Sequence, residues 1–189
     1  KIHEGYEAAA ESFEASIPLQ EESFTDEEIQ QRFLVQNRGG IRFTHKHDFV
    51  ILIDSNFSNY RDTVDEKSGT IIYNGTGEED QGFDKGVGKF NAKVRDANSV
   101  LLYFQKPEKN KIIFKYQVKY DSHTYSTEKN LEGKERRVIK FKLKIIKKLC
   151  PNCKETIASN DQEIEDNFGY RKINGKTIPQ SWCKSCRKF

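Results

Sequence analysis

The sequence predicts an α+β fold that is mainly antiparallel β. We expect a curved sheet or barrel, preceded by helices and followed by a small cysteine-containing module. Short segments rich in β-branched and aromatic residues recur between turn signals from residue 41 to residue 145. Apolar residues at helical spacing are found mainly in the first 36 residues. Four cysteines stand in two pairs near the end of the sequence.

Two helices are predicted in the N-terminal segment. In residues 3–16, apolar side chains recur at helical spacing among glutamates. A second helix is expected to begin near Thr25, because Thr25-Asp26-Glu27-Glu28 has the pattern of a capping box and precedes an apolar stripe. Residues 82–97 have an ambiguous pattern, within which we expect a short helix.

Strands are predicted at residues 41–43, 49–53, 70–73, 99–105, 113–120 and 137–145. The last two segments alternate, which indicates one buried and one exposed face. In the first of them, the residues expected to share the apolar face are Phe114, Tyr116, Val118 and Tyr120. In the second, they are Ile139, Phe141, Leu143 and Ile145, with Lys140, Lys142 and Lys144 on the opposite face.

Charge is unevenly distributed along the 189 residues, although the net charge is only +3. Residues 1–31 contain nine acids and one lysine, whereas residues 103–149 contain fourteen Lys or Arg and five acids. Such asymmetry favours a polyanionic partner, and a solvated lysine-rich surface is the alternative. No apolar run approaches the roughly 20 residues that span a bilayer, and no signal peptide is visible, so we expect no membrane partner.

The cysteines form the pairs Cys150-Pro-Asn-Cys153 and Cys183-Lys-Ser-Cys186, separated by 29 residues. Two such pairs can complete a tetrahedral site of four thiolates, which zinc favours. Disulfides and a redox pair are the alternatives, but nothing in the sequence indicates secretion. We therefore predict a structural Zn²⁺ site and three parts: a helical segment at 1–36, a β domain at 37–148 and a zinc ribbon at 149–189.

The last 40 residues resemble the zinc ribbons of HNH-type nucleases. The resemblance rests on the first cysteine pair, on Phe168-Gly169-Tyr170-Arg171, and on the stretch from Gln180 to Arg187. An HNH site needs histidines, and none follows His123. The resemblance therefore implies that any nuclease domain follows Phe189 or belongs to another chain.

Residues 37–146 resemble the SRA-like domains (SET- and RING-associated) of modification-dependent restriction endonucleases, which have a PUA-like barrel. The elements that carry the resemblance are, in order, NRGGIRF, FVILIDS, Tyr60-Arg61-Asp62, TIIYNGTG, Asp80-Gln81, Asn91 and VLLYF. The sequence departs from the family in two places. It has Tyr73-Asn74-Gly75 where Tyr-Thr-Gly is usual, and Glu79 where the family has glycine before Asp-Gln.

This resemblance implies that the chain recognises a modified cytosine, such as 5-methylcytosine, by flipping it out of duplex DNA. The implied base pocket has Tyr60 and Tyr73 as stacking rings, Asp62 as acceptor for the N4 amine, and Asn74 with Gly75 near O2 and N3. On pattern alone, Tyr73 can be a core residue, Asp62 can cap a turn, and Asn74-Gly75 can close a hairpin. We also expect Asp80 and Gln81 to hold their loop through backbone hydrogen bonds.

Basic residues supply the predicted contacts with DNA phosphates. These residues are Arg38, Arg42, Lys140, Lys142 and Lys144 in the β domain and Arg171, Lys172, Lys184 and Arg187 in the ribbon. We predict no catalytic residue. The resemblance implies the specificity part of a cytoplasmic bacterial or phage restriction endonuclease, and it allows a homodimer. The alternatives are an RNA-binding PUA-like module, a zinc-stabilised protein-interaction module, and a metal nuclease built on the acids at 78–80.

Overall fold

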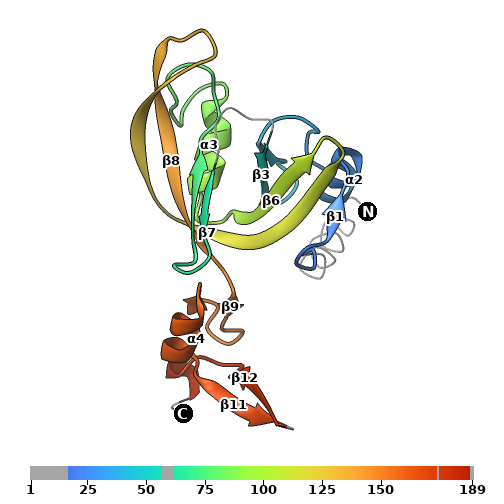
Figure 1. The fold of residues 1–189 in the computed structure, drawn as a ribbon, viewed down its shortest axis with the longest axis vertical. Coiled ribbons are helices and arrows are strands. Elements are labelled where there is room, and N and C mark those ends of the chain that lie inside the picture. The colour runs from blue at the N-terminus through green and yellow to red at the C-terminus, as the bar shows by residue number, and fades with distance from the viewer. Residues whose placement is uncertain (1–16, 57–61, 174, 188–189) are drawn as a thin grey trace.

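A strongly curved β-sheet dominates the computed structural model, which describes residues 17–56, 62–173 and 175–187 (Figure 1). The strand order is β2-β3-β6-β7-β8-β5-β4, and β1 also pairs with β7. All of these pairs are antiparallel except β3 with β6, so the predicted α+β, mainly antiparallel fold is confirmed. The strands are β1 (Ser23–Phe24), β2 (Ile41–Phe43), β3 (Phe49–Ser55), β4 (Thr63–Asp65), β5 (Thr70–Asn74), β6 (Val100–Glu108), β7 (Lys111–Lys129) and β8 (Glu135–Ile145).

Two helices accompany the sheet. Helix α2 (Asp26–Phe33) begins with the predicted capping box: the Thr25 side chain accepts from the Glu28 nitrogen, and the Glu28 carboxylate accepts from the Thr25 nitrogen at 2.7 Å. Helix α3 (Gly88–Arg95) lies within the segment whose pattern was ambiguous. The helix predicted over residues 3–16 falls outside the described residues. None of the described helices combines the length and the apolar character needed to cross a bilayer.

The central strands are buried on both faces. The inner core contains Leu52, Tyr73, Tyr103 and Phe141, and α3 contributes Val94 to it. The second core lies on the other face, where Ile51, Leu102 and Phe104 pack with Ile29 and Phe33 of α2. Burial on two sides explains why β3 and β6 read as unbroken apolar runs rather than as alternating patterns.

Strand β7 departs from the predicted alternation at one point. Tyr103 pairs with Tyr116 but its neighbour Phe104 pairs with Phe114, so Lys115 is an extra residue in a β-bulge. Phe114 therefore packs in the second core, with its ring centroid 5.2 Å from that of Phe104, whereas Tyr116 packs against the inner core. The prediction that Phe114 shares a face with Tyr116 is wrong, because alternation cannot reveal a bulge.

Strand β8 follows its predicted alternation throughout. Its alternate apolar residues from Ile139 to Ile145 are all buried in the inner core, and its lysines occupy the opposite face. Strands β7 and β8 together form the long curved hairpin that rises above the rest of the sheet in Figure 1.

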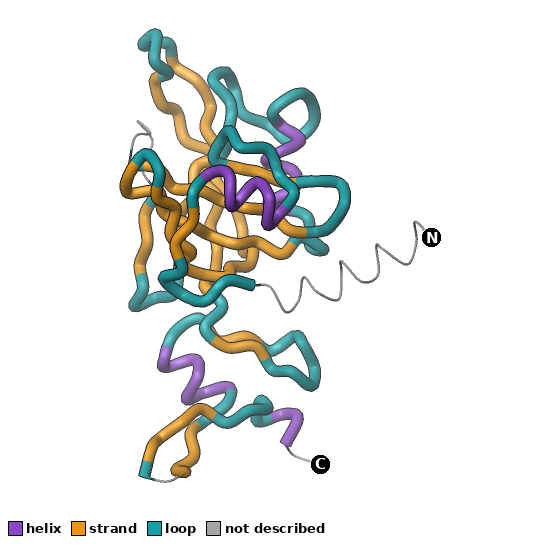
Figure 2. Tube along the Cα trace, turned by 90° about the vertical axis from the view of Figure 1, so that its right-hand side faces the viewer, coloured by secondary structure: helices purple, strands orange, loops and turns teal. Residues whose placement is uncertain are grey.

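The C-terminal residues form a smaller module that lies below the sheet in Figures 1 and 2. Its elements are β9 (Lys148–Leu149), β10 (Ile157–Ala158), α4 (Asp161–Asn167), β11 (Tyr170–Ile173), β12 (Lys176–Pro179) and a 3₁₀ turn at Ser185–Arg187. The turn between β4 and β5 touches this module. Gly69, at φ +67°, lies so close to Ser159 that an added Cβ would be 2.4 Å from the Ser159 carbonyl oxygen, so this contact requires glycine.

Candidate functional site

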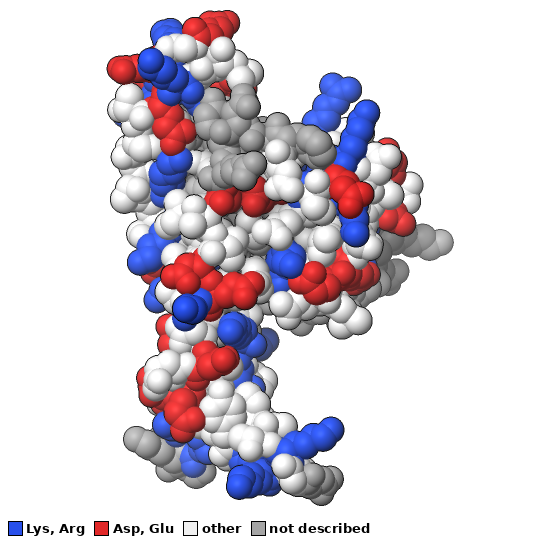
Figure 3. Space-filling model, in the orientation of Figure 1, with Lys and Arg blue, Asp and Glu red and all other residues white. Residues whose placement is uncertain are grey.

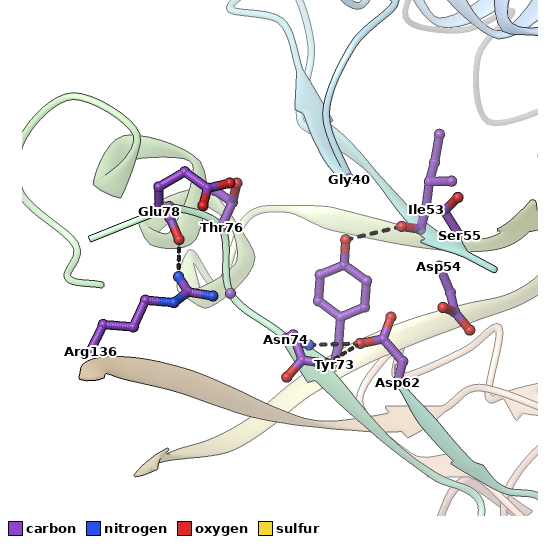
Figure 4. A pocket seen from close by; sticks show the side chains of 12 residues that line it. Gly40, Ile53, Asp54, Ser55, Asp62, Tyr73, Asn74, Thr76, Glu78 and Arg136 are labelled. Carbon is purple, nitrogen blue, oxygen red and sulfur yellow. Dashed lines mark hydrogen bonds between the residues drawn. The ribbon is translucent and has the colours of Figure 1, made fainter. Parts of the chain in front are cut away.

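A cavity of about 200 Å³ opens where β3 and β5 end, at the edge of the inner core (Figure 4). Its walls come from five segments that are far apart in the sequence. They are Gly40, Ile53 to Ser55 at the end of β3, Asp62, Tyr73 to Glu78 at the end of β5, and Arg136 at the start of β8. The structure thus brings together the predicted pocket residues Asp62, Tyr73, Asn74 and Gly75. Tyr60, the other predicted stacking ring, lies outside the described residues.

Asp62 is held in place by Asn74. The backbone nitrogen and the side-chain amide of Asn74 both donate to Oδ1 of Asp62, at 2.8 and 2.9 Å. The pKa of Asp62 is raised to about 7, mainly by burial and also by the nearby Asp54 carboxylate, while the hydrogen bonds from Asn74 and the charge of Lys140 act to lower it. Near neutral pH, this carboxyl can therefore switch between a charged acceptor and a neutral acid.

Tyr73 is at once a wall of the cavity and a core residue. Only 3% of it is exposed, and its hydroxyl donates to the Ile53 carbonyl at 3.5 Å. Its ring lies edge-to-face with that of Tyr103, whose hydroxyl donates to Asp54 at 3.0 Å. Tyr73 is therefore a core residue that also lines the cavity, and its role as a stacking ring stays a prediction. Gly40 matters here because an added Cβ would lie 2.9 Å from the Tyr73 hydroxyl oxygen.

The loop after β5 is fixed by two buried amides. Gln81 donates to the carbonyls of Gly75 and Gly77, and its Oε1 accepts from the Ile139 nitrogen at 2.8 Å. Asn91, on α3, makes hydrogen bonds to both the nitrogen and the carbonyl of Thr76. These bonds fix the conformation of the loop. Asn74-Gly75 does not form the turn of a two-residue hairpin, because the element that follows β5 is helix α3 and not a strand.

The acids at 78–80 are exposed, and one of them, Asp80, helps to hold this same loop. Asp80 accepts from the Arg137 nitrogen at 2.7 Å, and Glu79 lies 3.5 Å from Lys134. The expected role of Asp80 and Gln81 in holding the loop is confirmed. Among the described residues, the cysteines are the cluster with the geometry of a metal site, and these acids are not part of one.

The predicted phosphate contacts of the β domain have different surroundings. Arg42 is 3% exposed, donates to Asp26 at 2.6 Å and donates to the Gly39 carbonyl, so it is a buried structural cation and not a contact for DNA. This corrects the sequence-based prediction, whose pattern could not reveal the partner on α2. Arg38 is exposed. Lys142 and Lys144 are partly exposed and lie 3.6 and 3.9 Å from Asp121.

Lys140 is half-buried and is linked to the pocket through Asn74. It donates to Oδ1 of Asn74 and pairs with Glu128, and through Asn74 it is connected to Asp62. Sequence reasoning missed Gly40, Asp54 and Arg136 as pocket residues. Asp54 could have been proposed from the sequence, because it directly follows a buried apolar run. Nothing in the sequence indicates that Arg136 donates a hydrogen bond to the Gly77 carbonyl.

The four cysteines meet in the C-terminal module as predicted. Their sulfur atoms all lie within 4.8 Å of one another, and those of Cys153 and Cys183 are 4.0 Å apart. A tetrahedral zinc site with Zn–S bonds of about 2.3 Å places its sulfurs about 3.8 Å apart, so the arrangement fits such an ion. The small core of this module consists of Cys150, Ala158, Ile164, Phe168 and Cys183. Two of these residues are cysteines, which leaves little apolar area to hold the module together.

The family comparison decides the classification. The family described as "ScoMcrA-like, SRA domain" matches residues 21–175, which is most of the chain. The chain belongs to this family. The match includes the SRA sheet, the pocket and the first part of the cysteine module.

Solved structures agree with this SRA fold. The sulfur-binding and SRA domains of ScoMcrA, complexed with phosphorothioated DNA, match with a TM-score of 0.57 at 16% identity. That match covers 79% of this SRA chain and 43% of the other. The DNA recognition domain of LpnPI, a cytosine modification-dependent restriction endonuclease, matches with a TM-score of 0.56 at 14% identity, covering 68% and 74%. AspBHI, a DNA modification-dependent restriction endonuclease, matches with a TM-score of 0.51 at 16% identity, covering 64% and 67%. No curated protein matches the SRA chain by sequence.

Proposed function

We propose that this SRA domain recognises a modified cytosine in duplex DNA and holds the flipped base in the cavity beside Asp62. The observation that carries the proposal is the position of Asp62: a carboxyl oriented by two hydrogen bonds in a cavity of about 200 Å³ at the edge of an SRA sheet. The ScoMcrA domains were solved in complex with phosphorothioated DNA, and LpnPI is a cytosine modification-dependent restriction endonuclease, which supports modified DNA as the class of ligand.

The chemistry of the cavity suits the edge of a cytosine. An extruded base exposes an amine at N4 and acceptors at N3 and O2, which an enclosed site must pair. Both bonds from Asn74 use Oδ1 of Asp62, so we assign Oδ2 as the acceptor for N4. The loop at 74–77, held by Gln81 and Asn91, places backbone groups near the N3 and O2 acceptors of the base. Gly75 and Gly77 have no side chain that would block this approach.

The rings supply the stacking in this proposal. Tyr73 forms the inner wall, where its neutral hydroxyl is tied to Ile53, and Tyr60 is proposed from the sequence as the second ring. Stacking on an aromatic side chain contributes about 1–3 kcal/mol per base. Arg38, Lys142 and Lys144 are proposed to contact phosphates, while Lys140 orients Asn74.

We propose that the cysteine cluster binds one structural Zn²⁺. Cys150, Cys153, Cys183 and Cys186 would hold the ion, which would supply the cross-link that the small core lacks. In this account the whole chain is the recognition part of a modification-dependent restriction endonuclease, whose HNH-type nuclease domain lies outside these residues.

A competition assay tests the proposed function. A labelled duplex with one modified cytosine is bound by the chain and displaced with modified or plain duplex of the same sequence. Asp62→Ala is expected to remove the preference for modified DNA and to leave weak binding to both. The matched control is Asp65→Ala, an exposed acid three residues away, which should keep the preference. Retained preference in Asp62→Ala would show that the pocket is misplaced.

A further inference from the structure

Charge is sharply segregated within the C-terminal module. Its acids all lie between residues 155 and 166, in and before α4. From residue 167 to residue 187 there is no acid, and the cations are Arg171, Lys172, Lys176, Lys184 and Arg187, all of them exposed. Lys and Arg gather accordingly at the lower end of the molecule in Figure 3, the end that β11 and β12 form in Figure 1.

Large apolar side chains are exposed among these cations. Trp182 is 46% exposed, Ile173 is 42% exposed and Tyr170 is 37% exposed. Arg171 lies close to the Trp182 loop, because its guanidinium donates to the Ser181 hydroxyl at 3.4 Å. A solvated lysine-rich surface has no need of such aromatic groups, whereas a nucleic acid offers both phosphates and apolar sugar and base faces.

The shape of the element fits the same ligand. Strands β11 and β12 form a two-stranded ribbon, in which all four residues of β11 and the first two of β12 are exposed, while Ile178 and Pro179 are half-buried. The major groove of B-DNA is wide enough to admit a two-stranded β-ribbon. The base of the ribbon is closed by a hydrogen bond from the Gln180 nitrogen to the Gly169 carbonyl, three residues before Cys183 of the cysteine cluster.

We infer that the β11–β12 ribbon is a second DNA-binding surface, which engages a groove of duplex DNA independently of sequence and of the modified base. Lys172 and Lys176, on adjacent strands, contact phosphates, and Trp182 packs on the exposed edge of the duplex. The inference deepens the proposed function, since it adds a non-specific grip to the recognition of the base. It does not require the pocket to work as proposed.

Intrinsic fluorescence provides a direct test, because Trp182 is the single tryptophan of the chain. The zinc-loaded full chain is titrated with an unmodified duplex, and the emission of Trp182 is recorded together with the anisotropy of labelled DNA. We expect the emission to change in parallel with binding. Unchanged emission at saturating DNA would overturn the inference, as would a change with structured RNA or an acidic peptide but not with duplex DNA.

A charge-removal pair separates this surface from the pocket. Lys172→Ala/Lys176→Ala is expected to weaken binding to modified and plain duplexes by the same factor, about tenfold. It should also reduce the slope of log K against log salt by up to about 2, since each phosphate contact contributes about 0.9. Lys109→Ala/Lys111→Ala removes two exposed lysines from the β6–β7 turn and should change neither quantity.

A failure of the ribbon to bind DNA can be distinguished from a failure of the proposed base pocket. Loss of the preference for modified DNA in Asp62→Ala concerns the pocket, whereas a uniform loss of affinity with unchanged preference concerns the ribbon. Zinc content and circular dichroism, equal to those of the unsubstituted chain, show that the double variant is folded. If a folded Lys172→Ala/Lys176→Ala variant binds with the affinity and salt slope of the control, the ribbon is not a DNA-binding surface.

Discussion

Asn74 donates two hydrogen bonds to one oxygen of Asp62, one from its backbone and one from its side chain. Asn74→Ala removes the side-chain bond and the link to Lys140 but keeps the backbone bond. Because a single hydrogen bond contributes about 0.5–1.5 kcal/mol, we expect the preference for modified DNA to fall a few-fold and not to vanish. Competition binding measures this, with Asp62→Ala as the reference for complete loss. A loss as complete as that of Asp62→Ala would mean that Asn74 does more than orient the carboxylate.

The raised pKa of Asp62 predicts that recognition depends on pH. Acceptance from the N4 amine is strongest for the carboxylate, and burial raises the pKa of this group to about 7. We therefore expect the preference for modified over plain duplex to weaken as pH falls through about 7. Binding titrations between pH 5.5 and 8.5 measure it, with Asp62→Asn as the variant that should show no such dependence. A preference that is constant over this range would contradict the role of Asp62.

Stability should change with pH in the opposite sense. In the folded chain Asp62 holds its proton up to about pH 7, whereas in the unfolded chain it releases the proton near its ordinary pKa of 3.8. Stability from this group is thus present below about pH 4 and is lost as pH rises toward 7, by at most about 4 kcal/mol. Denaturant titrations of the unsubstituted chain and Asp62→Asn should therefore diverge over this range. Parallel curves would show that the pKa of Asp62 is not raised.

Some of the residues behind these expectations could be predicted from the sequence, and others could not. The capping box at Thr25, the alternation of β8 and the cysteine spacing follow from local rules, and each was predicted. The pocket required the resemblance, because Asp62 and Asn74 are twelve residues apart and only the pairing of strands brings them together. Phe114 and Arg42 were misplaced because a bulge and a buried ion pair with Asp26 depend on tertiary contacts. The same holds for Arg136, whose pocket position comes from the pairing of β8 with β5.

The amide of Gln81 is expected to control the shape of the pocket loop. Gln81→Ala removes three hydrogen bonds to the backbone of Gly75, Gly77 and Ile139 and leaves buried polar groups unpaired. Each unpaired group costs about 1–3 kcal/mol, so we expect a clear loss of stability together with a loss of preference for modified DNA. Chemical denaturation and binding measure the two effects. The exposed Glu79→Ala serves as the control and should leave both nearly unchanged.

Metal removal should unfold the C-terminal module selectively. We expect one zinc ion per chain by elemental analysis, and Cys183→Ser or a strong chelator should abolish it. Since two of the five core residues of the module are cysteines, the apo module should lose its structure, seen as a shift in Trp182 emission. The preference for modified DNA should survive, because the pocket lies in the SRA sheet. A Trp182 emission spectrum that is unchanged after chelation would contradict the metal site.

The most direct measurement of the central claim is a binding panel of short duplexes that differ only at one cytosine. The panel contains plain, 5-methyl, 5-hydroxymethyl and glucosylated cytosine, each with the full chain at fixed salt. We predict that at least one modified duplex binds at least tenfold more tightly than the plain duplex, and that this advantage disappears in Asp62→Ala. Equal affinity for all four duplexes would contradict the account of the cavity as a pocket for a modified cytosine.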